Sequence, residues 1–73
     1  MNAASLRFDD FVFLVGAFGF VFQRTRGSHS VYSREGVQEI LVIQERSGMA
    51  KPYQVRQFLR LVDSYALTLE RDA

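Results

Sequence analysis

The sequence contains no cysteine and no tryptophan, and only one proline and one histidine among its 73 residues. The absence of cysteine excludes a disulfide framework, a thiolate nucleophile and a zinc–thiolate site. A reducing compartment is therefore allowed, and we expect the protein to act in the cytoplasm. Because the sequence has no internal repeat and no linker rich in proline or glycine, we expect one domain over residues 1–73.

The chain also lacks a long hydrophobic run and a strong excess of one charge. Its longest apolar stretch, Phe11–Phe22, is too short to cross a bilayer and follows Asp9 and Asp10 rather than a basic segment. We therefore expect neither a signal peptide nor a membrane span. The formal net charge is +1, but no acidic residue occurs between Asp10 and Glu35, so this interval is locally basic. Its basic residues are Arg24, Arg26, His29 and Arg34.

Hydrophobic periodicity predicts two helices. From Phe8 to Phe18 apolar residues recur at helical spacing, and Gly19 follows as a residue able to take the positive φ found after a helix. The second helix begins with Pro52 at its first position, where proline is best tolerated. One face of this helix is apolar, and we expect it to face the core. The residues of that face are Val55, Phe58, Leu59, Val62 and Ala66.

Three short runs of residues predict strands. Phe20–Arg24 and Ser30–Tyr32 flank the pair Gly27-Ser28, a pattern typical of a β-hairpin. Ile40–Ile43 is a continuous apolar run of strand length, and residues 45–50, which include a Ser-Gly pair, are predicted as a loop. The order α-β-β-β-α predicts an α+β fold, a three-stranded antiparallel sheet with two helices on one face. This is the architecture of domains like the double-stranded-RNA-binding domain.

His29 is the residue best suited to proton transfer, because an imidazole both accepts and donates protons near neutral pH. It lies beside the glycine turn, in the basic interval, between Ser28 and Ser30. RNA can be cut without a metal if a base removes the 2′-hydroxyl proton and cations stabilise the charge that develops on the phosphate. One histidine and several arginines supply both functions. A surface or packing role for His29 is the alternative.

Metal-dependent and serine-hydrolase chemistry are both disfavoured. A two-metal site needs carboxylates that converge on one point, whereas Asp9 and Asp10 are adjacent on a helix and point about 100° apart. The remaining acidic residues follow no spacing typical of metal ligands. The adjacent pair Ser28-His29 is not the signature of a catalytic triad. We therefore predict neither a metal nor another cofactor.

Several further residues are candidates for contacts with ligands. Lys51 precedes Pro52, where a helix N-terminus presents free N–H groups to an anion, so it either contacts a phosphate or is a solvated lysine. Arg56 and Arg60 are expected on the outer surface of the second helix. Phe13 should project from the outer face of the first helix, where it is a candidate for contact with a partner or a second copy. A single exposed apolar residue more often has no such role.

Three segments together carry a more specific pattern: LVGAFGF at residues 14–20, RGSHSVY at residues 26–32 and KPYQVRQFL at residues 51–59. In this order they resemble the HicA (YcfA-like) toxin family, and the resemblance covers residues 6–66. It implies the fold described above and a toxin of a type II toxin–antitoxin pair, which cleaves messenger RNA until a HicB-like antitoxin covers it. The family's catalytic histidine matches His29.

The sequence departs from the family pattern after the third predicted strand. Many members carry Val-Pro-x-His there, followed by a glycine–lysine loop, whereas residues 43–49 read IQERSGM. Arg46 thus replaces the second histidine and Met49 replaces the lysine.

The sequence-based hypothesis is a metal-independent endoribonuclease in which His29 transfers the 2′-hydroxyl proton. Two alternatives remain open: a domain that binds RNA without cutting it, and a protein-interaction domain that uses the face around Phe13. The residues predicted to contact RNA or phosphate are Arg24, Arg26, Ser28, Lys51 and Arg46.

Overall fold

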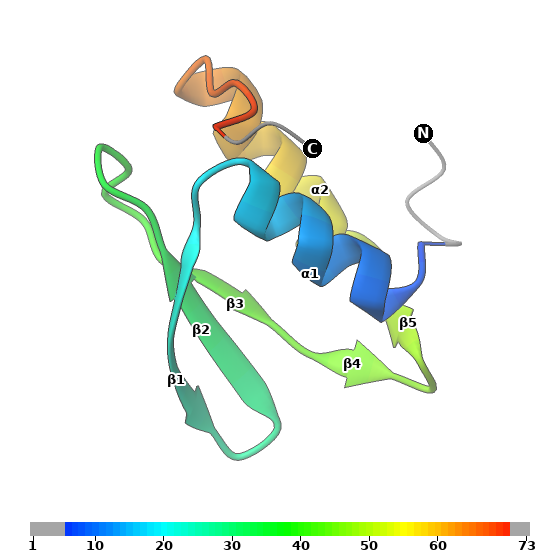
Figure 1. Ribbon diagram of the computed structural model, residues 1–73. Helices are drawn as coiled ribbons and strands as arrows, with labels where there is room; N and C mark the ends of the chain where they lie inside the picture. Colours follow the sequence, from blue (N-terminus) through cyan, green and yellow to red (C-terminus); the bar gives the residue numbers. More distant parts are fainter. Residues whose placement is uncertain (1–5, 71–73) are drawn as a thin grey trace.

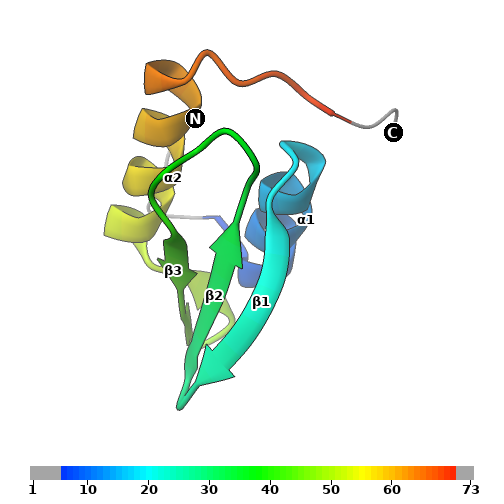
Figure 2. The same ribbon diagram turned by 90° about the vertical axis from the view of Figure 1, so that its left-hand side faces the viewer.

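The computed structural model describes residues 6–70. Figure 1 shows two helices on one side of an antiparallel sheet, and Figure 2 shows the three strands of that sheet in front of both helices. The predicted α+β fold with the order α-β-β-β-α is confirmed, with two short strands added before the last helix. The elements are α1 (Phe8–Ala17), β1 (Val21–Arg26), β2 (His29–Ser33), β3 (Leu41–Ile43), β4 (Glu45–Arg46), β5 (Met49–Ala50) and α2 (Pro52–Ser64).

Strands β1, β2 and β3 are neighbours in that order. Arg26 pairs with His29 across the turn Gly27-Ser28, in which Gly27 has a φ of +59°. A glycine with positive φ at the first central position is typical of two-residue hairpins, whose strands pair up to the turn itself. For this reason β1 runs to Arg26, two residues beyond the predicted end of the strand.

Residues 45–50 form a second hairpin rather than the predicted loop. Its turn, Ser47-Gly48, has positive φ at both residues, +52° and +78°, which is the geometry of a tight hairpin turn. The N–H of Phe8 donates to the Gly48 carbonyl at 3.0 Å, and the N–H of Ala50 donates to the Leu6 carbonyl at 2.9 Å. The hairpin is therefore attached to the start of α1.

Helix α1 ends in a Schellman motif. The N–H of Gly19 donates to the Gly16 carbonyl at 2.9 Å, and the N–H of Phe20 donates to the Val15 carbonyl at 3.2 Å. Gly19 has a φ of +93°, so the predicted positive φ is confirmed. The motif reverses the chain and buries Phe20, which was predicted as the first residue of a strand.

The core lies between the helices and the sheet, with Phe58 of α2 near its centre. The Phe58 ring meets three phenylalanine rings edge to face, with centroid distances of 5.8 Å to Phe11, 5.6 Å to Phe18 and 5.9 Å to Phe20. Such contacts contribute beyond the area they bury. Within residues 6–70 no helix is long and apolar enough to span a bilayer.

Helix α2 buries a stripe of residues next to the one predicted. Val55 and Phe58 are buried as predicted, but Leu59 is exposed and Leu61 is buried in its place. Both sets of residues have helical spacing, so the periodicity alone did not distinguish them. The buried stripe also includes Gln54, which is 2% exposed.

Arg34 joins the end of α1 to the segment that follows α2. Its Nε donates to the Phe18 carbonyl at 2.7 Å, its Nη1 donates to the Glu35 carbonyl at 2.8 Å, and its Nη2 pairs with the Glu70 carboxylate. The N–H of Glu70 also donates to the Ala17 carbonyl at 2.8 Å. Arg34 therefore has a structural role, although the sequence places it in the basic interval.

Candidate functional site

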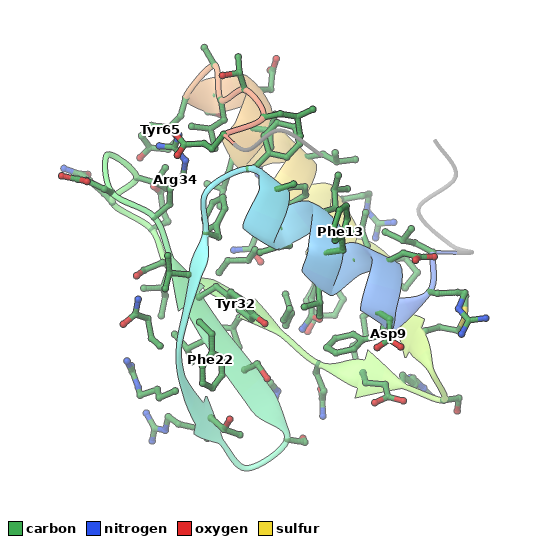
Figure 3. All side chains as sticks on the ribbon, in the orientation of Figure 1. Asp9, Phe13, Phe22, Tyr32, Arg34 and Tyr65 are labelled. Carbon is green, nitrogen blue, oxygen red and sulfur yellow. The ribbon has the colours of Figure 1, made fainter. Side chains whose placement is uncertain are left out.

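The predicted site residues of the β1–β2 hairpin lie on the sheet face that the helices leave uncovered. Directly opposite residues of an antiparallel pair share a face, and Tyr32 is opposite Leu41, which is fully buried. Figure 3 shows Tyr32 and Phe22 pointing toward the side on which α1 lies, and their ring centroids are 5.7 Å apart. Because side chains alternate along a strand, Val31 and His29 lie on the other face.

A β-bulge places both arginines of β1 on the same face as His29. The pairing skips one residue, Gln23, between Phe22 and Arg24. Regular alternation from Phe22 would put Arg24 and Arg26 on the helix side of the sheet, but the extra residue reverses their direction. As a result, Arg26 lies directly opposite His29 on the uncovered face.

This face is exposed at the end of the hairpin near the turn, whereas Val31 in the middle of β2 is only 3% exposed. The side chain of His29 is exposed, and β1 is exposed along its whole length. Among the described residues the only ion pair joins Arg34 and Glu70, so neither Arg24 nor Arg26 has a carboxylate partner there. The two guanidinium groups are therefore available to an anion at the position of His29.

A chain of hydrogen bonds joins the hairpin turn to the start of α2. The Lys51 Nζ donates to the Gln44 Oε1 at 2.6 Å, and the Gln44 Nε2 donates to the Ser28 Oγ at 2.6 Å. The main-chain N–H of Gln44 donates to the Oε1 of the buried Gln54 at 2.8 Å, which fixes Gln44 in place. Lys51 and Ser28 are thus brought to the same end of the sheet as His29.

Lys51 is the N-cap residue of α2, as its position before Pro52 predicts. Its side chain is directed to Gln44, and the residue is partly buried. An ammonium group has three donors, and Gln44 takes one of them. The other two donors are able to bind a further acceptor.

Arg46 lies apart from the two arginines of β1. It lines a hollow of about 280 Å³ between the β4–β5 hairpin and the start of α2. Lys51 also lines this hollow, so the lysine connects it to the chain of hydrogen bonds described above. The lining residues are Arg46, Met49, Ala50, Lys51, Pro52 and Tyr53, and we refer to this feature as the Tyr53 hollow.

Phe13 does not belong to this surface. It is 66% exposed on α1, in agreement with the spacing of that helix, and Figure 3 shows it on α1, away from the β1–β2 hairpin. Arg56 and Arg60 are exposed on α2, as predicted.

Sequence reasoning missed three polar residues that shape the site. Gln23 forms the bulge, Gln44 links Ser28 to Lys51, and Gln54 holds the main chain of Gln44. The sequence gives one weak signal, since Gln44 ends the apolar run of the most buried strand. Nothing local marks the other two.

A small α+β domain with a basic, uncovered sheet face is the class of protein that the fold and site define. A family model described as "HicA toxin of bacterial toxin-antitoxin" matches residues 8–63, which run from the start of α1 almost to the end of α2. The chain belongs to the HicA toxin family, as the sequence motifs predict. It is therefore a toxin of a toxin–antitoxin pair, and its family implies an antitoxin partner. No curated protein and no solved structure matches the chain.

Proposed function

We propose that this toxin is an endoribonuclease that cleaves messenger RNA without a metal ion, with His29 as the catalytic base. The observation that carries the proposal is the pairing of His29 with Arg26 on the uncovered sheet face. A base and a cation on directly opposite residues of two paired strands can act on one phosphodiester. Proton removal and charge stabilisation must occur within the same few ångströms. Messenger RNA as substrate also implies that the toxin acts in the cytoplasm.

The reaction is a transfer of the phosphoryl group within the RNA. The imidazole of His29 takes the 2′-hydroxyl proton as the 2′-oxygen forms a bond to phosphorus and the bond from phosphorus to the 5′-oxygen breaks. The leaving 5′-oxygen takes a proton from the histidine, from Lys51 or from water. The products are a 2′,3′-cyclic phosphate and a 5′-hydroxyl end.

The cations hold the phosphate while its charge develops. Arg24 and Arg26 face the same side as His29, and a guanidinium binds two phosphate oxygens at once. Ser28 accepts a hydrogen bond from Gln44, so its own hydroxyl proton is free to be donated to a phosphate oxygen. Lys51 bonds to Gln44, and Arg46 lines the same hollow as Lys51. Both would contact phosphates further along the RNA strand from the one at His29.

The proposed reaction uses no metal ion. In the part of the chain from residue 6 to residue 70, no group of three histidine, aspartate or glutamate side chains is placed to hold a metal. A two-metal mechanism requires such convergence. If His29 is the base and the cations hold the phosphate, cleavage proceeds in the presence of a chelator.

The test is a cleavage assay on a 5′-labelled RNA with EDTA present. The His29→Ala variant should cleave about 10²- to 10⁴-fold more slowly than the wild type. Thr25→Ala is the matched control, because Thr25 lies between the two arginines on β1 but is paired with Ser30 on the helix side. The proposal is wrong if His29→Ala keeps full activity, if EDTA stops the reaction, or if the products carry 5′-phosphates. RNA binding by the wild type without any cleavage would favour the binding module.

We further propose that the partner is a HicB-like antitoxin and that Phe13 contributes to its contact surface. A phenylalanine that is 66% exposed presents apolar area that a partner can bury. Phe13→Ala should weaken the complex with a HicB-like antitoxin and leave RNA cleavage unchanged. If the wild type and Phe13→Ala bind the antitoxin with equal affinity, Phe13 is not part of the contact surface.

A further inference from the structure

We propose that the Tyr53 hollow binds one unpaired base of the RNA, stacked on the Tyr53 ring, next to the nucleotide that is cut. This inference rests on the proposed function, because it takes RNA as the substrate. It adds a subsite that the catalytic histidine and the arginines of β1 do not provide.

The lining of the hollow matches the chemistry of a nucleotide. Met49, Pro52 and Tyr53 supply apolar surface, and Arg46 and Lys51 supply positive charge. A nucleotide needs both, because the faces of its base are apolar and its phosphate is an anion. A volume of about 280 Å³ is at the lower limit for small-molecule sites and is suited to a single base rather than a larger group.

Tyr53 is placed to act as a stacking platform. Tyr53 is 56% exposed and lines the hollow, so its ring is accessible to a base. Its hydroxyl accepts a hydrogen bond of 3.2 Å from the Nε2 of Gln54, which is 2% exposed. Because the buried amide restrains the phenol, the ring needs little reordering before it contacts a base.

The position of the hollow relative to His29 suits adjacent nucleotides. Lys51 lines the hollow and bonds to Gln44, which in turn bonds to Ser28, the neighbour of His29. Each of these two hydrogen bonds is 2.6 Å long, so a single short row of side chains separates the hollow from the hairpin turn. A phosphate held by Lys51 would place one nucleoside at His29 and the next in the hollow.

Charge favours RNA over a protein segment as the occupant. Of the described residues, the six that line the hollow include two cations and no acidic side chain. This charge complements the phosphate that accompanies every base of an RNA strand. Occupation by a segment of the antitoxin is the competing outcome, which the experiment distinguishes.

The test uses a variant with Tyr53 as its only tyrosine. The chain has three tyrosines and no tryptophan, so the changes Tyr32→Phe and Tyr65→Phe leave Tyr53 as the sole emitter at tyrosine wavelengths. His29→Ala keeps the RNA intact during the measurement. A short single-stranded RNA should quench the emission of this triple variant as it binds.

Affinity supplies the second measurement. Adding Tyr53→Ala should raise the Kd for the same RNA by about 5- to 150-fold, which corresponds to about 1–3 kcal/mol per stacked base. Tyr53→Phe should keep the affinity, because the ring remains. Leu59→Ala is the matched control, since Leu59 is exposed on the same helix but does not line the hollow. An RNA with one abasic position should bind more weakly than the intact RNA to the protein that retains Tyr53. The same change in the RNA should not alter its affinity for Tyr53→Ala.

The outcomes separate the subsite from the proposed function. RNA that binds without quenching, together with an unchanged Kd for Tyr53→Ala, would overturn the subsite and leave the cleavage assay of the wild type unaffected. Quenching by the antitoxin and not by RNA would assign the hollow to the protein partner and overturn the inference. Absence of RNA binding at low salt would overturn both proposals.

Discussion

Removal of the Arg34 guanidinium should lower the free energy of unfolding by about 2–4 kcal/mol. The bond from Nε to the Phe18 carbonyl is partly buried and charged, and such bonds contribute about 1.5–3 kcal/mol. The bond to the exposed Glu35 carbonyl adds roughly 0.5 kcal/mol. The Glu70 carboxylate belongs to a side chain that is 51% exposed, so this ion pair adds only about 0–1 kcal/mol.

Urea unfolding followed by circular dichroism measures this contribution. Arg34→Met keeps most of the aliphatic stem and removes all of the donors, so it should show the full loss and lower the melting temperature by at least about 8 °C. Glu70→Gln is the matched control, because it removes only the charge of the ion pair and should cost less than about 1 kcal/mol. The reasoning is refuted if Arg34→Met costs under about 1 kcal/mol, or if Glu70→Gln costs as much as Arg34→Met.

Gly19 provides an independent check on the same contact. A Cβ at this position would lie 2.9 Å from the Arg34 Nε, and the φ of +93° is itself unfavourable for other residues. Gly19→Ala should therefore be strongly destabilising in the wild-type protein. In an Arg34→Ala background no side-chain atom remains at the position of the Nε, while the contact with the Glu70 side chain and the backbone strain persist, so the two changes should be less than additive.

Three further predictions concern the ends of α2 and the proposed phosphate contact. Ala66 has a φ of +52° just after the helix. Ala66→Gly should raise the unfolding free energy by about 0.5–1 kcal/mol, since relief of the left-handed strain exceeds the added entropy of the unfolded chain. A lower urea midpoint for Ala66→Gly than for the wild type would contradict this prediction. The hydrogen bond to Glu39 raises the pKa of Tyr65, so the stability from this bond is present below a pH of about 10 and is lost as the pH rises through the raised pKa. As the pH rises above about 10, the urea midpoint should fall less for Tyr65→Phe than for the wild type. Parallel plots of midpoint against pH for the two proteins would contradict a contribution from this hydrogen bond. Lys51→Met should weaken RNA binding about equally for different sequences and reduce the slope of log K against log salt by about 1; an unchanged slope would show that Lys51 contacts no phosphate.

The end of α1 and the start of α2 could be predicted because local chemistry determines them, whereas Ala66 was wrongly placed on the apolar face of α2, which ends at Ser64. Pro52 occupies the first position of α2, and Gly19 adopts the positive φ that follows α1. Both features depend on the conformational preference of a single residue. The side of α2 that faces the core depends instead on where the sheet lies, and Leu59 was assigned to the wrong side for that reason.

The hairpin at residues 45–50 could not be distinguished from a loop. Both structures use a Ser-Gly pair, and strands of two residues are too short to show alternation. The hydrogen bonds that attach this hairpin to Leu6 and Phe8 join residues about forty positions apart in the sequence. No local pattern encodes such contacts.

The candidate site residues could be named from the sequence one by one, but their arrangement could not be predicted. Gly27 and Ser28 form a hairpin turn through local preferences, and His29 follows directly after it. The direction of Arg24 and Arg26 depends on a bulge, and nothing in the run from Phe22 to Arg26 marks which residue is the extra one. The bond from Gln44 to Ser28 spans 16 positions and exists because β2 and β3 pair in one particular register.

His29 and the two arginines of β1 are exposed and lie outside the core, and this separation makes the test on His29 interpretable. β1 is exposed along its length, whereas Phe58 of α2 contacts three aromatic rings in the core. Substitution of exposed residues usually changes stability by less than about 0.5 kcal/mol, while a small domain has little stability to lose. Loss of cleavage by His29→Ala with an unchanged urea midpoint would therefore report on chemistry. A midpoint shift well beyond that limit would instead mean that the hairpin supports the fold, contrary to its exposure.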